Sequence, residues 1–89
     1  MPDERTVMDR IKELMVDKLQ LDGLDPAGIP DDATFEFLEL DSVDALELVV
    51  WLEKDFGIKV ANEDLRRETF ESITSLANVV LGYVRAKEA

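Results

Sequence analysis

Residues 41–49 read DSVDALELV, a serine between two aspartates that leads into a run of helix-forming apolar residues. Asp41 and Ser42 are residue types that accept hydrogen bonds from the first free N–H groups of a helix. Asp44 follows Asp41 by three residues, which is the spacing of a capping box. The stretch therefore predicts that a helix begins here, with Ser42 at or just before its start and the serine hydroxyl near solvent. A helix start also favours anionic groups, including a phosphate.

This helix is predicted to span residues 42–56, with Gly57 as its C-terminal stop. At about 100° per residue, one face holds the side chains expected in the core, which are Ala45, Leu48, Val49, Leu52 and Phe56. Val43, Leu46 and Val50 fall on or toward the opposite face. Because so small a domain can hardly bury every side of one helix, we expect these three to form an apolar patch for a partner. The acids around that patch are Asp41, Asp44, Glu47 and Glu53. The alternative is that the loop of residues 20–40 folds over part of this face.

Three further helices are predicted over residues 4–19, 63–67 and 75–85. The first and last follow from apolar residues at helical spacing, and the short middle one follows from a possible cap at Asn62 with Leu65 as its anchor. Their expected N-terminal caps are, in order, Asp3 or Thr6, Asn62 and Thr74. The connection over residues 20–40 is long and contains several glycines and prolines. Residues 34–37 alternate like a strand, but no second strand is evident, so we predict a loop with at most one helical turn. The side chains expected to pack this loop on the helices are Leu21, Leu24, Ile29, Phe35, Phe37, Leu38 and Leu40.

The 89 residues predict one domain, residues 1–89, with an all-α fold: a small bundle of three to four helices with a long loop between the first two. There is no cysteine and no histidine, which removes disulfides, thiolate metal sites and the commonest general base. Ser42 therefore has no histidine to activate it, and the chain alone is not expected to be an enzyme. The acids of the loop do not have the spacing of a calcium-binding EF-hand, so no metal site is expected.

The charge is uneven: ten basic and twenty-one acidic residues give a net charge of −11, and no basic residue occurs between Lys18 and Lys54. We expect neither nucleic acid nor an anionic membrane as a partner, because both bind basic surfaces. The acids around Ser42 should attract basic partners; the alternative is a solvated surface that keeps the protein soluble. No signal peptide is evident at the first residues, and no apolar run approaches the roughly 18 residues of a membrane span. A cytoplasmic monomer is the expectation.

The motif of residues 41–49, in a short and strongly acidic chain, resembles the acyl carrier proteins. The resemblance covers nearly the whole chain, because the expected order of helices and the long first loop match that family. In the family the serine of the D-S-L motif carries 4′-phosphopantetheine through a phosphodiester, which implies Ser42 here. A phosphopantetheinyl transferase would attach this arm, and acyl-transferring and chain-elongating enzymes with basic docking patches would read the second helix. The residues implied for docking are Asp41, Val43, Asp44, Leu46, Glu47, Val50 and Glu53.

The resemblance also implies an acyl chain sheltered inside the bundle, and the residues suggested for its lining are Leu48, Leu52, Phe56, Ile58, Leu65 and Val80. Three positions depart from the family pattern: Glu39 stands where glycine is common, Val43 replaces the usual leucine, and Trp51 is bulkier than expected. The leading hypothesis is an acyl carrier for fatty-acid or related biosynthesis. A specialised carrier of polyketide, aminoacyl or peptidyl groups is the second. A third, from a different class, is an unmodified acidic helical interaction module in which Ser42 is only a cap.

Overall fold

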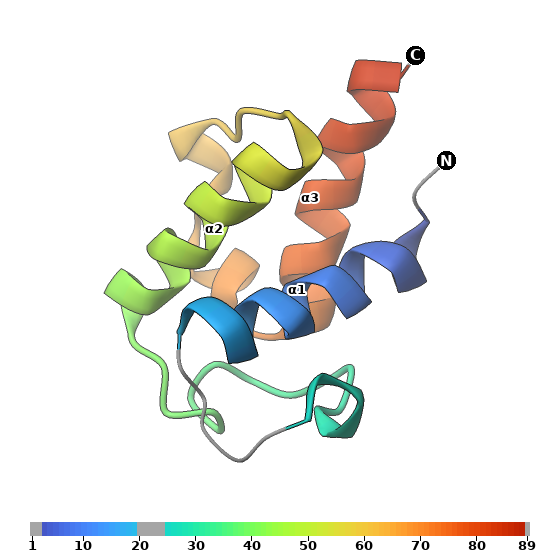
Figure 1. Cartoon of the computed structure of the whole chain (residues 1–89). Coiled ribbons are helices and arrows are strands. Elements are labelled where there is room, and N and C mark those ends of the chain that lie inside the picture. The colour runs from blue at the N-terminus through green and yellow to red at the C-terminus, as the bar shows by residue number, and fades with distance from the viewer. Residues whose placement is uncertain (1–2, 20–24, 89) are drawn as a thin grey trace.

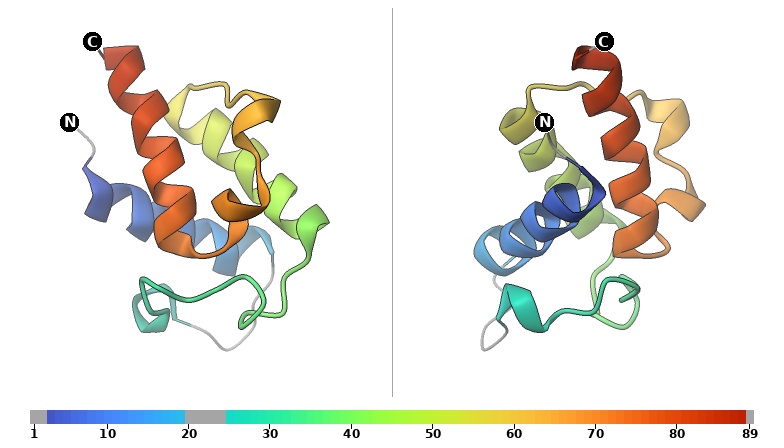
Figure 2. Two further views of the ribbon diagram at one scale, coloured as in Figure 1. Left: turned by 180° about the vertical axis from the view of Figure 1, so that it is seen from behind. Right: turned by 90° about the vertical axis from the view of Figure 1, so that its right-hand side faces the viewer.

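The computed structural model describes residues 3–19 and 25–88, with Glu88 by its backbone only. The described residues form three α-helices: α1 (Glu4–Lys18), α2 (Ser42–Phe56) and α3 (Ile73–Glu88). Three short 3₁₀ turns lie between them: η1 (Pro26–Gly28), η2 (Asn62–Asp64) and η3 (Arg67–Phe70). Helix α1 packs across both α2 and α3 (Figure 1). The connection that carries η2 and η3 lies on the opposite side of the bundle from α1 (Figure 2). The predicted all-α class is confirmed for the described residues, which contain no strand.

One hydrophobic core joins the three helices, because each helix directs an apolar stripe toward the others. Its fully buried members with the largest side chains are Val7, Ile11, Met15, Leu48, Leu52, Ile73, Leu76 and Val80. On α2 the predicted inner face is confirmed for Ala45, Leu48, Val49 and Leu52, which are all buried. Phe56 is half-buried and packs at the edge of this core.

The ends of α1 and α2 follow their local sequence. Helix α1 begins after Asp3, whose carboxylate accepts a hydrogen bond from the Thr6 N–H at 2.9 Å, and it ends one residue before the predicted limit. Helix α2 has the predicted bounds of residues 42 and 56. It ends at Gly57, whose φ of 65° lies in the left-handed region that glycine adopts without strain. The predicted stop at Gly57 is thus confirmed by its backbone conformation.

The short helix predicted over residues 63–67 is wrong, because the chain forms the two separate turns η2 and η3 there. Asn62 is the first residue of η2 and does not cap it, since Ala61 holds the cap position without a side-chain hydrogen bond. Thr69 explains the break. Its buried hydroxyl donates to the Asp64 carbonyl at 2.6 Å and accepts from the Arg66 N–H at 3.3 Å. A side chain bonded to the backbone in this way replaces the bonds that a continuous helix would make.

Helix α3 extends beyond the predicted residues 75–85 at both ends. It begins at Ile73 because the Ser72 hydroxyl accepts a hydrogen bond from the Ser75 N–H at 3.1 Å, as a helix cap does. Thr74, the predicted cap, lies inside the helix and donates its hydroxyl to the Asp31 carbonyl at 2.8 Å. At the far end Lys87 donates to the Phe56 carbonyl at 3.2 Å, which ties the last turn of α3 to the end of α2.

The loop between α1 and α2 packs on the helices only in part as predicted. Its buried side chains are Ile29, Ala33 and Phe35, and Leu38 and Leu40 are half-buried against the core. Leu21 and Leu24 lie outside the described residues. The prediction is wrong for Phe37, whose side chain is 71% exposed. Thr34 makes a single antiparallel bridge with Ser72, so the partner for the strand-like residues 34–37 is the residue just before α3.

Asp31 fastens this loop to α1 and α3. Its carboxylate forms ion pairs with Arg5 and Lys12 of α1, and its carbonyl accepts the hydrogen bond from Thr74 of α3. Lys12 is only 5% exposed, so this ion pair supplies a counter-charge to a buried ammonium group. Hydrogen bonds from Arg5 and then Lys12 lower the pKa of Asp31 to about 2. The loop that leads to Ser42 is therefore held in place by charge as well as by apolar packing.

Candidate functional site

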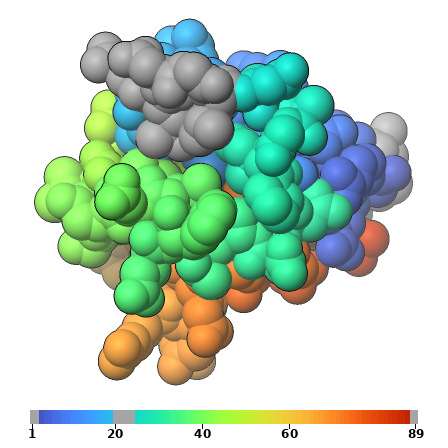
Figure 3. Space-filling model, turned by 90° about the horizontal axis from the view of Figure 1, so that it is seen from below, coloured from blue at the N-terminus to red at the C-terminus, as the bar shows by residue number. Residues whose placement is uncertain are grey.

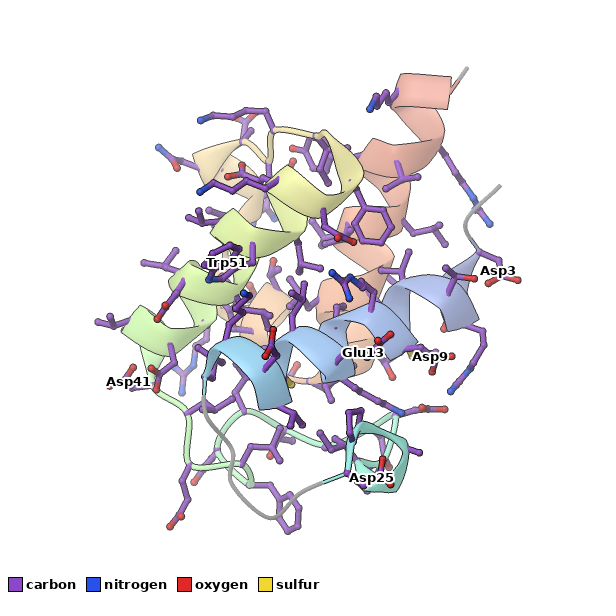
Figure 4. The ribbon with its side chains drawn as sticks, viewed as in Figure 1. Asp3, Asp9, Glu13, Asp25, Asp41 and Trp51 are labelled. Atoms are coloured by element: carbon purple, nitrogen blue, oxygen red, sulfur yellow. The ribbon has the colours of Figure 1, made fainter. Side chains whose placement is uncertain are left out.

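The first turn of α2 leaves the Ser42 hydroxyl out of the helix cap. Asp41 is the cap: its Oδ1 accepts from the Asp44 N–H at 2.9 Å, and Asp44 Oδ2 accepts from the Asp41 N–H at 3.3 Å. These two bonds complete the predicted capping box. Ser42 is the first helical residue and is exposed. Figure 4 shows Asp41 at the outer end of α2. The hypothesis that Ser42 is only a cap is therefore wrong in its geometry.

This arrangement suits Ser42 as a group that another enzyme modifies. The hydroxyl is accessible and stands on a helix start, where the free N–H groups favour a phosphate. The chain has no histidine that could take its proton. The described residues also hold no group of three or more acids that could bind a metal ion. Ser42 is thus exposed at the first position of a helix whose start is fixed by the capping box of Asp41 and Asp44.

The outer side of α2 carries an apolar surface, which we call the α2 face and define as Val43, Leu46 and Val50. These side chains are 69%, 47% and 46% exposed, respectively. The described part of the loop, residues 25–40, therefore leaves these side chains open, and the predicted outward position of all three residues is confirmed. Asp41 and Glu47 beside them are exposed, and Asp44 is half-buried. The α2 face has the composition of an aliphatic contact surface with an acidic rim.

Glu53, the last acid expected on that rim, has a different environment. It is half-buried, and its Oε2 accepts a hydrogen bond from the Val60 N–H at 2.8 Å. This bond holds the connector after α2 against the helix. Glu53 thus bonds the connector that follows α2, whereas Asp41 and Asp44 bond the first turn of the helix itself, and a docking role for Glu53 stays a prediction.

Trp51 lies where α2 meets the end of α1 (Figure 4). Its ring is half-buried, with the Lys18 ammonium 4.4 Å and the Lys54 ammonium 5.1 Å from the ring centroid. Each cation–π contact of this kind contributes roughly 0.5–1 kcal/mol at an exposed site. The bulky indole therefore fits without disturbing the core, because it spans the junction of two helices instead of entering the bundle. The sequence marked Trp51 as unusual but did not show that Lys18 would reach it.

Glu39 has a backbone φ of 58°, and it is the one non-glycine residue with a positive φ in the described chain. A side chain in this left-handed region costs roughly 1–2 kcal/mol compared with its preferred conformations. The family that the sequence resembles commonly has glycine at this place. The structure offers a reason, because the turn before Asp41 has a positive φ at this position, which glycine adopts without strain.

The six residues suggested for an acyl-chain lining do not share one environment. Leu48, Leu52 and Val80 are fully buried in the core, whereas Phe56, Ile58 and Leu65 are half-buried at its edge. A surface groove of about 450 Å³ is lined by other residues, which are Thr34, Glu36, Arg67, Glu68, Phe70 and Glu71. The lining therefore stays a prediction. Within residues 3–19 and 25–88, no helix is long and apolar enough to cross a membrane.

Comparison with known proteins identifies the family. A family model described as "Phosphopantetheine attachment site" matches residues 9–80. An acyl carrier protein of Solidesulfovibrio magneticus is 36% identical over 63 residues, which cover 70% of this chain and 77% of that protein. Polyketide-8 synthase acyl carrier protein 2 of Streptomyces avermitilis is 44% identical over 69 residues, which cover 76% of this chain and 70% of that protein.

A solved structure agrees in fold. The crystal structure of an acyl carrier protein from Thermotoga maritima superimposes with a TM-score of 0.78 over 94% of this chain and 93% of that one, at 19% identity. The shared fold, the family match and the two relatives lead to one conclusion. The chain belongs to the acyl carrier proteins, a family of phosphopantetheine-bearing carriers that are not themselves catalysts.

Proposed function

We propose that Ser42 is the attachment residue for 4′-phosphopantetheine and that the loaded arm carries acyl groups as thioesters to enzymes of fatty-acid or related biosynthesis. The observation that carries this proposal is the exposed Ser42 hydroxyl on the first residue of α2, with the capping contacts supplied by Asp41 and Asp44. A transferase needs a hydroxyl that it can reach and that does not move away. Both conditions support Ser42 over any other serine, because Ser72 and Ser75 are half-buried and share a hydrogen bond of 3.1 Å.

In the attachment step, coenzyme A donates its phosphopantetheine group to Ser42. Ser42 Oγ forms a new bond to the phosphorus next to pantetheine, and the pyrophosphate bond breaks to release adenosine 3′,5′-bisphosphate. The serine proton passes to the transferase, because this chain has no histidine to take it. The attached arm supplies a terminal thiol. Since the chain has no cysteine, that thiol would be the only one on the protein.

The α2 face and its acids support weak docking of successive basic enzymes. Its rim of Asp41, Asp44 and Glu47 lies in a chain of net charge −11, which steers positively charged partners toward Ser42. The three aliphatic side chains then provide a small apolar contact. The proposed partners are a phosphopantetheinyl transferase and acyl-transferring or chain-elongating enzymes with basic docking patches. We also expect the carrier to be a cytoplasmic monomer.

Intact mass spectrometry tests the attachment site. The protein is incubated with coenzyme A, magnesium and a broad-specificity phosphopantetheinyl transferase, and it should gain the mass of one phosphopantetheine group. Ser42→Ala should gain nothing, whereas Ser75→Ala, the control on α3, should be modified like the wild type. A wild-type protein that stays unmodified would support the interaction module instead. An equal gain in Ser42→Ala would assign the arm to another residue.

A specialised carrier is the second candidate, and one observation favours it. The Streptomyces avermitilis relative, which is named as a carrier of a polyketide synthase, shares 44% identity with this chain over 69 residues. Polyketide, aminoacyl and peptidyl cargo are the options within this candidate. A turnover assay distinguishes the fatty-acid carrier from the specialised carrier. The modified protein is loaded with malonyl or acyl groups and offered to fatty-acid and polyketide ketosynthases. Preferential turnover by the fatty-acid enzyme would exclude the specialised carrier.

A further inference from the structure

We infer that the turn of residues 34–40 is a second docking element, in which Phe37 anchors the phosphopantetheinyl transferase by entering an apolar pocket rimmed with lysine or arginine. This inference rests on the proposed attachment at Ser42. It extends the contact surface beyond α2 to the chain segment just before it. Four observations on the exposure, support, charge and position of Phe37 lead to it.

Phe37 is the most exposed large apolar side chain among the described residues, at 71%. Single exposed apolar residues are common on protein surfaces and need no explanation by themselves. Phe37 differs because its neighbours along the loop are packed: Phe35 is buried, and Leu38 and Leu40 are half-buried. The loop thus turns three apolar side chains inward and leaves the one ring outward.

Hydrogen bonds hold the backbone of the turn at Phe37. The Phe37 N–H donates to the Thr34 hydroxyl at 2.9 Å, and the Leu40 N–H donates to the Phe35 carbonyl at 2.9 Å, which closes the turn. Phe35 in turn packs edge-on against Phe70, with ring centroids 6.1 Å apart. Because the backbone of the turn is already ordered, a partner that covers the ring does not have to order the loop, which lowers the entropic cost of binding.

Acidic residues flank the ring, and one of them, Glu39, has a strained backbone conformation. Glu36 and Glu39 on either side of Phe37 are exposed, and Glu39 holds its left-handed φ of 58° where glycine would fit without strain. One basic side chain, Arg67, shares the nearby groove with Glu36, but Glu68 and Glu71 line it too. The surroundings of Phe37 are thus acidic, which matches an apolar pocket with a basic rim.

The position of Phe37 close to Ser42 points to the transferase as its partner. Phe37 lies five residues before Ser42, and five residues span at most about 18 Å. Figure 3 shows residues 25–40 spread over the face seen from below, with the start of α2 beside them. The transferase must bring its active site to the Ser42 oxygen itself, so its surface comes within reach of Phe37. Enzymes that act on the far end of the arm have no such requirement.

Steady-state kinetics of the attachment reaction test this inference. Initial rates with coenzyme A and the transferase are compared for wild type, Phe37→Ala, Phe37→Trp and Asn78→Ala. The last is an exposed neutral control on α3. Phe37→Ala should lower kcat/KM about tenfold, mainly through a higher KM, as expected for loss of an anchor residue. Phe37→Trp, which keeps an aromatic ring, should stay within about twofold of wild type, and so should Asn78→Ala.

The outcomes separate the inference from the proposed function. If wild type is modified at Ser42 and Phe37→Ala reacts equally well, the second docking element is refuted while the attachment site stands. If the wild-type protein is never modified, both the attachment site and the second docking element are refuted. A lower kcat with an unchanged KM would also refute docking. Urea unfolding controls for folding: because Phe37 is exposed, its alanine variant should keep the wild-type midpoint. A shifted midpoint that accounts for the rate loss would assign Phe37 a structural role instead.

Discussion

Glu39 and Phe37 belong to the same turn but are unusual in different ways. Glu39 has an unusual backbone conformation, and Phe37 has an unusually exposed side chain. The turn before α2 needs a positive φ at position 39, and glutamate accepts it at a cost in free energy. At position 37 the same turn directs an apolar ring outward, although the hydrophobicity of Phe37 predicts that it packs against the bundle. Hydrophobicity alone did not distinguish Phe37 from Phe35, because both are phenylalanines in one alternating stretch.

Replacing Glu39 with glycine should stabilise the protein. Glycine removes the left-handed strain, although its greater freedom in the unfolded chain offsets part of the gain, so we expect an increase of about 0.5–1 kcal/mol in the free energy of unfolding. Glu36→Gly is the matched control, since Glu36 lies in the same turn without a positive φ, and it should be neutral or destabilising. Urea unfolding followed by circular dichroism measures both. A less stable Glu39→Gly would show that the carboxylate itself contributes to stability.

At the scale of elements, capping and anchoring determine where Ser42 stands. The capping box of Asp41 and Asp44 begins α2, and Gly57 ends it, so this helix depends mainly on residues within its own stretch. The loop before it depends on distant residues instead. Asp31 joins the loop to Arg5 and Lys12 of α1 and to Thr74 of α3. The position of the turn that precedes Ser42 therefore rests on contacts between segments far apart in the sequence.

This anchor predicts a loss of stability in acid. The pKa of Asp31 in the folded protein is about 2, held below the usual 3.8 by hydrogen bonds from Arg5 and Lys12. Because the folded pKa is the lower one, the contribution of Asp31 is present above about pH 4 and is lost as pH falls toward 2. Asp31→Asn should be less stable than wild type at pH 7, since it leaves the Lys12 ammonium buried without its carboxylate.

The test is urea unfolding at several pH values from 7 to 2. The difference in unfolding free energy between wild type and Asp31→Asn should shrink as the pH falls from 4 to 2. Asp32→Asn, a change of the same type at the exposed neighbouring residue, should show no such convergence. A constant difference across this range would mean that the substitution acts through side-chain packing or hydrogen bonding at position 31, and not through the charge of Asp31.

At the scale of the whole molecule, a net charge of −11 surrounds a small apolar face. The six ion pairs among the described residues engage only Arg5, Arg10, Lys12 and Lys18 among the basic side chains. All four belong to α1, and none of these ion pairs involves Asp44 or Glu47, the acids in the first two turns of α2. This division leaves the end of the molecule that carries Ser42 strongly negative, and basic partners should approach it faster at low ionic strength.

Glu47→Lys should therefore weaken partner turnover while leaving the fold intact. The exposed Glu47 borders the α2 face, and we expect kcat/KM with the transferase to fall about three- to tenfold at low salt. Glu13→Lys on α1 is the control: replacing one negative by one positive charge takes either variant from −11 to −9. At about 1 M salt, where the screening length is about 3 Å, the two variants should converge. Equal rates at low salt would count against docking through the α2 face.

The sequence by itself determined the helices whose signals are local. The capping residues, the Gly57 stop and the apolar spacing of α2 all lie within or beside residues 42–56, and its predicted bounds and buried face agree with the structure. The same stretch carried the resemblance to the acyl carrier proteins, which the family match confirms. Short-range hydrogen bonds and helical periodicity act over a few residues, so helix bounds and buried faces can be predicted from the local sequence alone.

Only the tertiary structure decided which side chains make contacts between distant segments and which face solvent. Thr69 breaks the expected third helix by binding the Asp64 carbonyl, and Thr74 leaves its expected capping role to reach Asp31. The outward position of Phe37 and the stacking of Lys18 on Trp51 belong to the same class. In each case a side chain can satisfy its hydrogen bonds or bury its surface in several ways. The choice among them depends on a partner that folding brings close from elsewhere in the chain.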